Sequence, residues 1–373
     1  MKTLRIAVIG SGAFAEACHI PGLQSHHCAE VVALCGQRYE STRLLAQRMN
    51  VPEVYIDHEE LLSRADIDAV TIATPNVVHA RIAQAALRTG KHVFCEKPLA
   101  MNVREVLDMV RAAEDSGKIH QVAFTYRYLH GVQELKYRVM RGDIGDPHFL
   151  RMQFDTWQGL HPNSKIGFRD KIALAGGGIL YDLGSHLFDL ARFVLGPIEE
   201  VTGFTKLVPR LRRDRSDKQW EPVETDDIAA AWFMCKNGVH GQWFASRVSP
   251  SSREKAFIEV IGQQGALKAS LSRGTVDTLS VSRPTQQGWE NVPLAPEASN
   301  GKPHCLDTMM HSFVDACLRG KLDANIDASF YDGLAAQQAL AAVNEAFQTQ
   351  EWVHLNDGLF NAQYKVSTNP YLL

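Results

Sequence analysis

The chain opens with an apolar strand that runs directly into a glycine-rich loop. Residues 4–9 are mostly apolar, and residues 10–15 read G-S-G-A-F-A. Gly10 permits a tight turn off the strand, Gly12 lets a pyrophosphate approach the backbone, and Ala15 keeps the next helix close to the sheet. The N–H groups at the start of that helix favour a bound anion. The pattern predicts a dinucleotide site formed by Gly10, Gly12, Ala13, Phe14 and Ala15.

The length and charge of the chain limit its class. Because 373 residues exceed the roughly 250–300 at which a single core stops growing, we expect two domains. With 39 basic and 42 acidic side chains, the net charge of −3 gives no overall attraction for nucleic acid or an anionic membrane. No apolar run reaches the roughly 18 residues of a membrane span, and the start of the chain has no signal-peptide pattern. We therefore expect a cytoplasmic protein without nucleic-acid or membrane partners.

The seven cysteines are scattered along the chain and form no C-x-x-C pair. Paired cysteines at short spacing are the usual mark of zinc or redox sites. We expect reduced thiols, mostly in the core, and no metal site.

Apolar runs alternate with helical patterns through the first third of the chain. Strands are predicted at 4–9, 30–35, 69–73, 92–95 and 120–124, and helices near 13–19, 40–49, 58–64, 77–89 and 102–116. This alternation is typical of βαβ units in a parallel sheet. We place the first domain at residues 1–125.

After residue 125 the pattern changes to strands joined by short turns. These strands are predicted at 148–156, 199–208, 228–236, 239–248, 255–261, 266–271 and 275–282. The hairpin-like turns imply a largely antiparallel sheet. Residues 209–225 and 283–303 are predicted to be exposed loops, and helices are predicted near 305–319 and 329–348. We place the second domain at 126–355 and a tail at 356–373.

A triple glycine at 176–178 precedes an apolar helical pattern that carries Asp182 and His186. Four residues apart on an α-helix, the two side chains lie on one face. An imidazole suits proton transfer near neutral pH, and a nearby carboxylate can orient it. The alternative is a structural helix whose polar pair caps a buried edge.

A second candidate is the apolar strand at 92–95, which ends in Glu96-Lys97-Pro98. In an open α/β sheet, ligands bind outside the carboxyl ends of the strands, where Lys97 falls. An ammonium there would polarise a carbonyl or stabilise an alkoxide. The alternative is a surface ion pair between Glu96 and Lys97.

These motifs together resemble the Gfo/Idh/MocA family of oxidoreductases. The resemblance covers roughly residues 4–355, and the motifs occur in the order found in the family. The matching segments are residues 10–15, 73–79 (A-T-P-N-V-V-H), 96–98 (E-K-P), 176–178 (G-G-G) with Asp182 and His186, 226–229 and 261–265.

The resemblance implies a Rossmann domain followed by an α+β domain with a large, mainly antiparallel open sheet. It also implies hydride transfer between NAD(H) or NADP(H) and a sugar, cyclitol or related polyol. In that reaction Lys97 stabilises the alkoxide, His186 takes the hydroxyl proton, and Asp182 orients His186 or a substrate hydroxyl. The residues implied at the cofactor, besides the glycine loop, are Thr74, Pro75, Asn76, His79, Glu96 and Lys97.

Further residues near these motifs are weaker candidates for the substrate site. Arg127 begins the second domain, where the family often has an arginine near substrate or cofactor. Trp157, His161 and Arg169 precede the triple glycine, where a substrate wall is expected. A structural role is the alternative for each.

The chain departs from the common NAD pattern after the second strand. An acidic residue that would bind the ribose hydroxyls is missing from Gly36-Gln37-Arg38. Arg38 instead suits a 2′-phosphate, so NADP is slightly favoured over NAD. The alternative for Arg38 is a solvated residue at the start of a helix.

Two other functions are open at this level: glycoside cleavage through transient oxidation with a tightly held NAD, and a cofactor-binding regulator without catalysis. The joint presence of Lys97, Asp182 and His186 argues against the regulator. We also expect a homodimer or homotetramer formed through the open face of the second sheet. Trp232, Phe233 and Trp243 are the aromatic residues that we expect in its strands.

Overall fold

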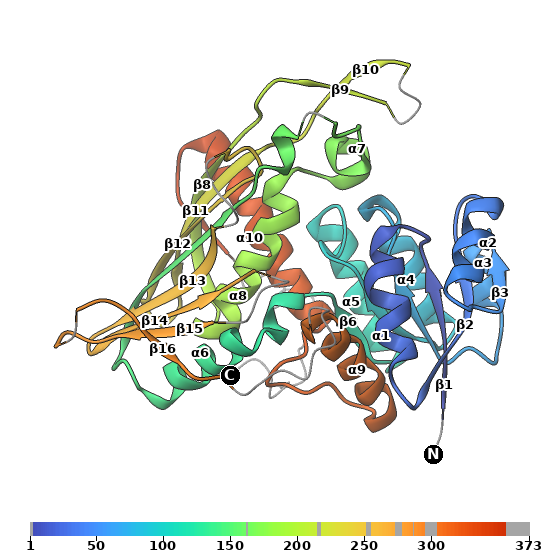
Figure 1. Ribbon diagram of the computed structural model, residues 1–373, viewed down its shortest axis with the longest axis horizontal. Helices are drawn as coiled ribbons and strands as arrows, with labels where there is room; N and C mark the ends of the chain where they lie inside the picture. Colours follow the sequence, from blue (N-terminus) through green and yellow to red (C-terminus); the bar gives the residue numbers. More distant parts are fainter. Residues whose placement is uncertain are drawn as a thin grey trace.

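The computed structural model describes residues 3–161, 163–214, 218–250, 255–272, 278–285, 287–294 and 304–355. Within these ranges the chain forms two large sheets, each with its own helices, and one two-stranded sheet (Figure 1). The predicted tail at 356–373 and part of the strand predicted at 275–282 lie outside the described residues. In the described residues, no helix combines the length and the apolar character that a membrane span needs.

The N-terminal sheet has six parallel strands in the order β3-β2-β1-β4-β5-β6, which confirms the predicted Rossmann fold. Its strands are β1 (Leu4–Ile9), β2 (Ala29–Cys35), β3 (Glu53–Tyr55), β4 (Ala69–Ile72), β5 (His92–Cys95) and β6 (His120–Val122). Its helices are α1 (Ile20–Gln24), α2 (Tyr39–Arg48), α3 (His58–Leu62), α4 (His79–Arg88) and α5 (Val103–Ser116). A π-helical turn, Ala15–His19, precedes α1.

The second sheet has nine strands in the order β16-β15-β14-β13-β7-β12-β11-β8-β17. All its pairs are antiparallel except β7 with β12, so the prediction of a mainly antiparallel sheet is confirmed. Its strands are β7 (Pro147–Asp155), β8 (Ile198–Lys206), β11 (Ile228–Cys235), β12 (His240–Ser246), β13 (Lys255–Gly262), β14 (Gly265–Ser270), β15 (Leu279–Ser282), β16 (Glu290–Val292) and β17 (Val353–His354).

Helices lie on the side of this sheet that faces the Rossmann domain (Figure 1). The helices of the second half are α6 (His130–Arg141), α7 (Ile172–Ala175), α8 (Ser185–Leu195), α9 (His304–Arg319) and α10 (Phe330–Thr349). Successive residues of a strand point to opposite faces. Phe233 and Trp243 are therefore buried toward the helices, whereas Trp232 is 49% exposed on the other face. All three lie in strands of this sheet, as expected, but only Trp232 faces the open side.

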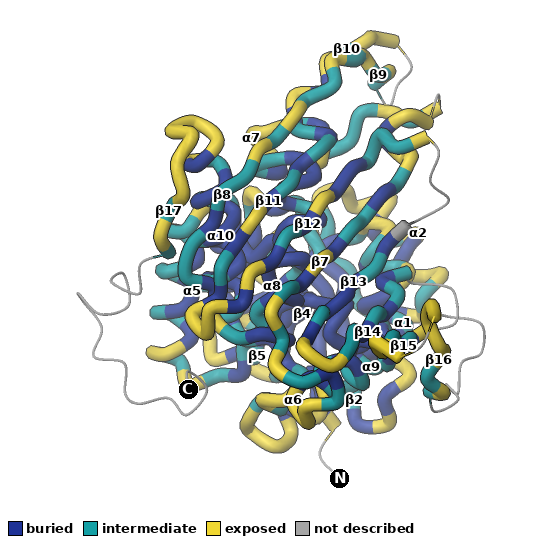
Figure 2. Tube along the Cα trace, turned by 90° about the vertical axis from the view of Figure 1, so that its left-hand side faces the viewer, coloured by how far each residue is buried: buried dark blue, intermediate teal, exposed yellow. Residues whose placement is uncertain are grey.

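Aromatic side chains nevertheless gather on the open face, which Figure 2 views directly. Phe204 and Phe244 are 44% and 36% exposed, and both flank Ala230 of β11 in the sheet register. The Trp232 ring lies 6.3 Å from that of Phe149. We call Phe149, Phe204, Trp232 and Phe244 the open-face aromatic patch.

The two predicted loops both contain strands. Residues 209–225 include β9 (Leu211–Arg213) and β10 (Trp220–Pro222), which pair as a hairpin, although 215–217 lie outside the described residues. Residues 283–303 include β16. Strands of three residues carry too short an alternation to be distinguished from loop.

The last two helices return to the Rossmann domain. Helix α9 packs on α1, and α10 packs on α5 and β6. The backbone N–H of Val122 in β6 donates to the carbonyl of Ala328 at 2.8 Å, and Phe330 and Leu334 belong to one core with Rossmann residues. The C-terminal helices therefore join the two domains.

Candidate active site

The glycine loop has the geometry of a dinucleotide cradle. Gly10 has φ +119°, and a Cβ there would lie 2.2 Å from the carbonyl oxygen of Ala73. No L side chain fits that close approach. A Cβ at Gly12 would instead point into open space, where a pyrophosphate reaches the backbone N–H groups. The Thr74 hydroxyl beside this loop is buried without a hydrogen-bond partner in the described residues. The cradle and this unpartnered hydroxyl fit a dinucleotide.

Two side chains, those of Asn76 and His79, fix the turn after β4 by contacting backbone carbonyls. His79 is fully buried, and its ring nitrogens lie 2.9 Å from the Thr74 carbonyl and 3.1 Å from the Pro98 carbonyl. Burial lowers the pKa of His79, although the hydrogen bonds to the Thr74 and Pro98 carbonyls oppose the shift. Asn76 donates to the carbonyl of Ala175 in the second domain at 2.8 Å. In these contacts His79 and Asn76 bind protein backbone, although the resemblance placed both at the cofactor.

Lys97 and Asp182 meet across the domain boundary. Lys97 Nζ donates to Asp182 Oδ1 at 2.6 Å and to the Asp182 carbonyl at 2.8 Å. The Lys97 side chain is 11% exposed and that of Asp182 is 33% exposed. The predicted surface pair of Lys97 with Glu96 is replaced by this interdomain pair. The Lys97–Pro98 peptide bond is cis.

Burial and charge oppose each other at this pair. Burial lowers the pKa of Lys97, and the Asp182 carboxylate partly restores it. Burial would raise the pKa of Asp182, but the charges of Lys97 and Arg169 hold it well below its ordinary value. Asp182 is therefore an anion across the physiological range, and its charge favours the ammonium form of Lys97 against the effect of burial.

His186 is on the adjoining turn but is buried. Its ring is 2% exposed and stands edge-on to Tyr126 at 4.6 Å and to Phe124 at 5.8 Å. The segment Leu180–Gly184 is π-helical and runs into α8 at Ser185. Because a π-turn adds a residue to the hydrogen-bonded ring, the four-residue spacing no longer gives the simple shared face of an α-helix.

The triple glycine lets Asp226 cap this π-turn. A Cβ at Gly178 would lie 2.0 Å from the Asp226 carbonyl oxygen. The Asp226 carboxylate accepts from the N–H groups of Gly178 and Leu180 at 2.7 and 2.8 Å. These contacts fix the start of the segment that carries Asp182.

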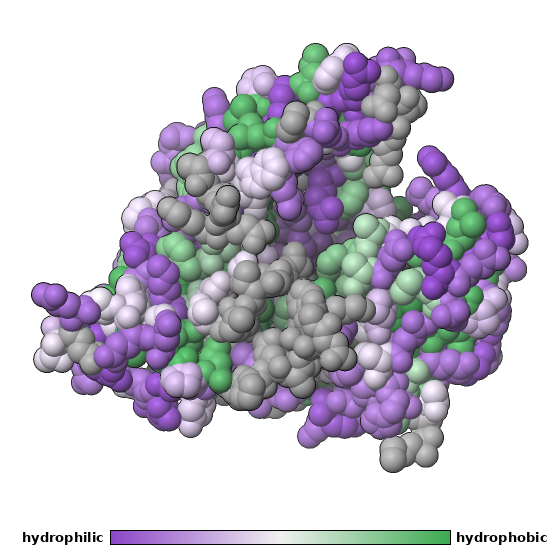
Figure 3. Space-filling model, viewed as in Figure 1, coloured by the Kyte–Doolittle hydropathy of each residue, from purple (hydrophilic) through white to green (hydrophobic). Residues whose placement is uncertain are grey.

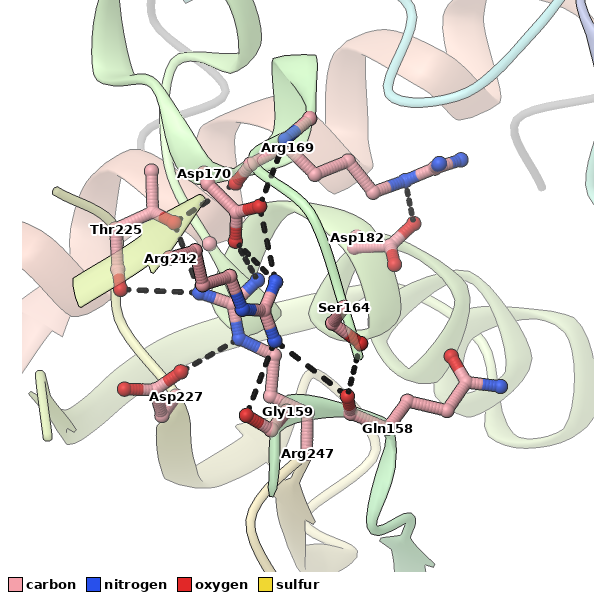
Figure 4. Close-up of polar contacts among 12 residues, drawn as sticks. Gln158, Gly159, Ser164, Arg169, Asp170, Asp182, Arg212, Thr225, Asp227 and Arg247 are labelled. Carbon is pink, nitrogen blue, oxygen red and sulfur yellow. Dashed lines mark hydrogen bonds and ion pairs between the residues drawn. The ribbon is translucent and has the colours of Figure 1, made fainter. Parts of the chain in front are cut away.

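Arg169 extends from a buried ion-pair network toward Asp182 (Figure 4). Its Nε lies 3.4 Å from Asp182 Oδ1. Its carbonyl accepts from Thr225 Oγ1 at 2.7 Å. The next residue, Asp170, accepts from Arg212 at 3.0 Å and lies 3.5 Å from Arg247. The network anchors the Arg169 backbone while the side chain, 53% exposed, remains accessible.

Trp157 and His161 form a partly exposed pair before Arg169. Their rings lie 5.1 Å apart, and Trp157 is 47% exposed. Figure 3 shows the molecular face hollowed between the β9–β10 hairpin and the Rossmann domain. The second domain thus offers an accessible guanidinium beside Asp182, and an accessible indole in the segment that precedes Arg169.

Arg127 is buried, and protein groups bind its guanidinium. Its role at a substrate stays a prediction. The side chain is 4% exposed. It donates to Asp189 at 2.6 and 2.8 Å, to Asp332 at 3.0 Å and to the Asp327 carbonyl at 3.1 Å. Each guanidinium nitrogen therefore has a protein partner.

Arg38 precedes α2 and is exposed. Its carbonyl accepts from the Thr42 hydroxyl at 2.8 Å, and the Thr42 hydroxyl lies 3.3 Å from that of Ser11 in the glycine loop. The guanidinium has no ion-pair partner among residues that the structure describes. Arg38 is thus placed beside the glycine loop with its charge available.

Sequence reasoning missed His19, the last residue of the π-turn after the glycine loop. It is fully buried and lies 3.1 Å from Glu96. A histidine on the apolar side of the helix that starts at a glycine loop was the available signal.

Comparison with known proteins agrees with this geometry. The profile "Oxidoreductase family, NAD-binding Rossmann fold" matches residues 4–124, and the profile "GFO/IDH/MocA C-terminal domain" matches residues 132–268. A levoglucosan dehydrogenase from Pseudarthrobacter phenanthrenivorans is 27% identical over 340 residues, which cover 83% of this chain and 85% of that protein. A myo-inositol 2-dehydrogenase from Thermotoga maritima is 29% identical over 278 residues, which cover 74% and 78%.

A solved structure of levoglucosan dehydrogenase in complex with NADH and levoglucosan has a TM-score of 0.87 to this chain at 26% identity. The match covers 95% of this chain and 100% of that one. Both domains and their order are therefore shared. The chain belongs to the Gfo/Idh/MocA family of NAD-binding oxidoreductases.

Proposed function

We propose that this enzyme transfers a hydride between a hydroxyl-bearing carbon of a sugar, cyclitol or related polyol and the nicotinamide of NAD(H) or NADP(H). The observation that carries the proposal is the Lys97–Asp182 contact at 2.6 Å. It joins a Rossmann strand end, where ligands bind in this fold, to the segment that carries His186. The glycine loop and the turn at Thr74 and Pro75 would hold the cofactor.

Each residue has a distinct chemical role in this proposal. When bound, the nicotinamide accepts the hydride in the oxidation direction and supplies it in the reduction direction. His186 takes the proton of the substrate hydroxyl as the C–H bond breaks and the C=O bond forms. Lys97 donates a hydrogen bond to the oxygen and stabilises its developing negative charge. Asp182 holds the Lys97 ammonium and contacts a second hydroxyl.

The second domain supports a sugar as the substrate. Trp157 offers apolar ring surface for the C–H face of a pyranose, and its indole N–H is a donor. The open guanidinium of Arg169 presents donors for hydroxyl oxygens. The two named relatives act, by their names, on levoglucosan and myo-inositol, which are both polyhydroxylated rings.

The related proteins named above are dehydrogenases, which favours net redox turnover over glycoside cleavage or regulation.

We place the reaction in the cytoplasm because all seven cysteines are buried thiols, as is usual in a reducing compartment.

The test is a substrate panel with purified protein. Levoglucosan, myo-inositol, D-glucose and a methyl glucoside are each mixed with NAD and with NADP, and the near-ultraviolet absorbance of the reduced cofactor is followed. Steady reduction with at least one compound supports the dehydrogenase. Release of methanol from the glycoside without net reduction would indicate cleavage through transient oxidation, and cofactor binding without any turnover would indicate a regulator.

A further inference from the structure

A buried histidine connects the glycine loop to the lysine of the proposed reaction. The π-turn Ala15–His19 begins at the last position of the glycine motif and ends at His19, whose side chain is 0% exposed. The ring stands edge-on between Phe14 at 5.8 Å and Phe94 at 5.5 Å. An imidazole in such apolar surroundings needs a polar partner.

That partner is Glu96. His19 Nε2 lies 3.1 Å from Glu96 Oε1, and Nδ1 has no hydrogen-bond partner in the described residues. An ionised carboxylate only accepts hydrogen bonds, so Nε2 carries a proton and donates a hydrogen bond to Glu96. Glu96 Oε2 in turn accepts from the backbone N–H of Lys97 at 3.3 Å.

Lys97 is therefore held at both ends. Glu96 fixes its backbone from the Rossmann side, and Asp182 fixes its Nζ from the second domain at 2.6 Å. The Glu96 side chain is only 12% exposed. One Glu96 oxygen contacts His19, and the other accepts from the backbone N–H of Lys97. We call this chain of contacts from His19 through Glu96 to Lys97 the brace.

We propose that His19 is a positioning residue for Lys97, acting through Glu96 and not through contact with substrate. The proposal rests on the proposed role of Lys97 in hydride transfer. When a contact is lost at a distance from the reacting atoms, the catalytic group can be displaced slightly. Such a displacement lowers the reaction rate more than it weakens substrate or cofactor binding. Loss of the His19 donor should therefore affect kcat in preference to affinity.

The chain offers a matched control in His26. This histidine is 7% exposed and lies 3.3 Å from the carboxylate of Asp315. His26 lies between α1 and the start of β2, which is the end of the sheet opposite the glycine loop. In the described residues it makes no contact with Glu96 or Lys97. A His26→Leu variant removes a buried histidine that is paired with a half-exposed carboxylate, and it leaves the contacts of His19, Glu96 and Lys97 in place.

The experiment compares His19→Leu, His19→Gln and His26→Leu in the full-length enzyme. The first readout needs no substrate: the rate at which formaldehyde and dimethylamine borane methylate the Lys97 amine, mapped by mass spectrometry. The second is kcat and KM with the sugar that the panel identifies, and the third is NADH affinity by fluorescence. Melting temperature is measured for every variant.

We expect His19→Leu to methylate faster at Lys97 and to lose roughly 10- to 10²-fold in kcat, with KM and NADH affinity little changed. His19→Gln, which keeps a donor near the position of Nε2, should recover most of the rate. His26→Leu should behave as wild type at Lys97 and in kcat, whatever its melting temperature.

Wild-type methylation and kcat in His19→Leu would overturn the proposal, as would equal losses in all three variants in step with their melting temperatures. If His19→Leu does not fold, Glu96→Gln tests the same brace at nearly constant shape, and wild-type behaviour there is equally decisive against it. The methylation result stands even if no sugar is turned over, so a failure of the proposed function is seen separately.

Discussion

At the scale of single residues, the Lys97 ammonium is a charge that burial disfavours and one carboxylate supports. Its pKa is lowered by burial and by Arg169 and raised by Asp182. The same contact keeps Asp182 ionised. Charge and position at this site are thus set by one pair from two domains, which makes the pair sensitive to single substitutions.

Lys97→Ala and His186→Ala should each lower kcat by about 10²- to 10⁴-fold, the usual contribution of a general acid or base. Cofactor affinity should be largely kept, because the glycine loop is unchanged. Steady-state rates with the sugar identified by the panel, together with NADH titration and melting curves, check this. A His186→Ala protein that melts normally, binds NADH and turns over at nearly the wild-type rate would remove His186 from the mechanism.

Asp182→Asn should lower kcat less than Lys97→Ala, but it should change the pH dependence. Without the carboxylate, burial and Arg169 act unopposed on Lys97, so the pKa of Lys97 falls further. Lys97 then loses its proton at a lower pH, and the alkaline limb of the kcat profile should move to lower pH. An alkaline limb at the wild-type position would show that ionisation of Lys97 does not limit the rate.

Arg38→Ala should weaken NADP binding and leave NAD binding nearly unchanged, because Arg38 offers an unpaired charge to a 2′-phosphate. Arg43→Ala is the matched control, since Arg43 lies in α2, directly after Arg38, but is paired with Glu40. Fluorescence titration with both reduced cofactors measures the preference. Tighter wild-type binding of NAD by tenfold or more would contradict the predicted NADP preference.

The residues that sequence reasoning located are those with a local signature. Gly10 could be located because it directly follows an apolar strand, and Lys97 because it lies just after the end of another. The ion pairs of Arg127 could not be predicted, because its partners Asp189 and Asp332 lie 62 and 205 positions away. His19 was missed for the same reason, since its partner Glu96 is 77 positions away.

At the scale of elements, the junction of β6 with α10 contains a titratable acceptor. The Phe330 N–H at the start of α10 donates to His120 Nδ1 at 3.1 Å. Burial lowers the pKa of His120 from 6.5 to about 4, although Asp332 opposes the shift. Protonation would turn the Nδ1 acceptor into a donor and break the contact. The neutral ring therefore contributes stability that is complete above about pH 6.5 and is lost as pH falls toward 4.

His120→Asn should reduce the loss of unfolding free energy between pH 7 and pH 5, because the amide oxygen accepts the same N–H and does not titrate. Denaturant unfolding at both pH values measures the difference. His240→Asn, at an exposed histidine of β12, should leave the difference unchanged. An equal acid sensitivity in His120→Asn and wild type would show that this junction does not contribute.

Element prediction succeeded where periodicity was long enough to read. Strand β11 alternates over eight residues and helix α5 repeats over 14, and both were placed within a few residues. Strand β3 and the two strands of the β9–β10 hairpin have three residues each and were not predicted. Helix α6 was also missed, because the region around it is dominated by strand patterns.

At the scale of the whole molecule, the helices that the structure describes lie on one face of the nine-stranded sheet. The open-face aromatic patch of Phe149, Phe204, Trp232 and Phe244 lies on the other. Exposed aromatic clusters of this kind are typical of interaction sites. We expect a homodimer or homotetramer in which this face meets a second copy.

Trp232→Glu should shift the assembly toward the monomer, because it places a charge in a buried apolar contact. Trp220→Glu is the control, since Trp220 is 58% exposed but lies in the β9–β10 hairpin. Light scattering measures the mass of each. A wild-type mass near 41.5 kDa at micromolar concentration would rule out the oligomer.

The fold class was predictable because strands alternate with helices in the first third of the chain, whereas short turns join strands after residue 125. How the halves are joined was not, since α9 and α10 look like ordinary amphipathic helices until their partners α1 and α5 are known. Contacts over such distances leave no trace in local periodicity.

The return of α10 to β6 has a consequence for synthesis on the ribosome. His120 and Phe330 are 210 positions apart, so at roughly 5–20 residues per second some 10–40 s separate their emergence. During that interval the β6 edge and the apolar surface of α5 have no covering helix. The half of the enzyme that is translated first is therefore completed last, and a nascent chain stalled before α10 would present an unfinished Rossmann domain to chaperones.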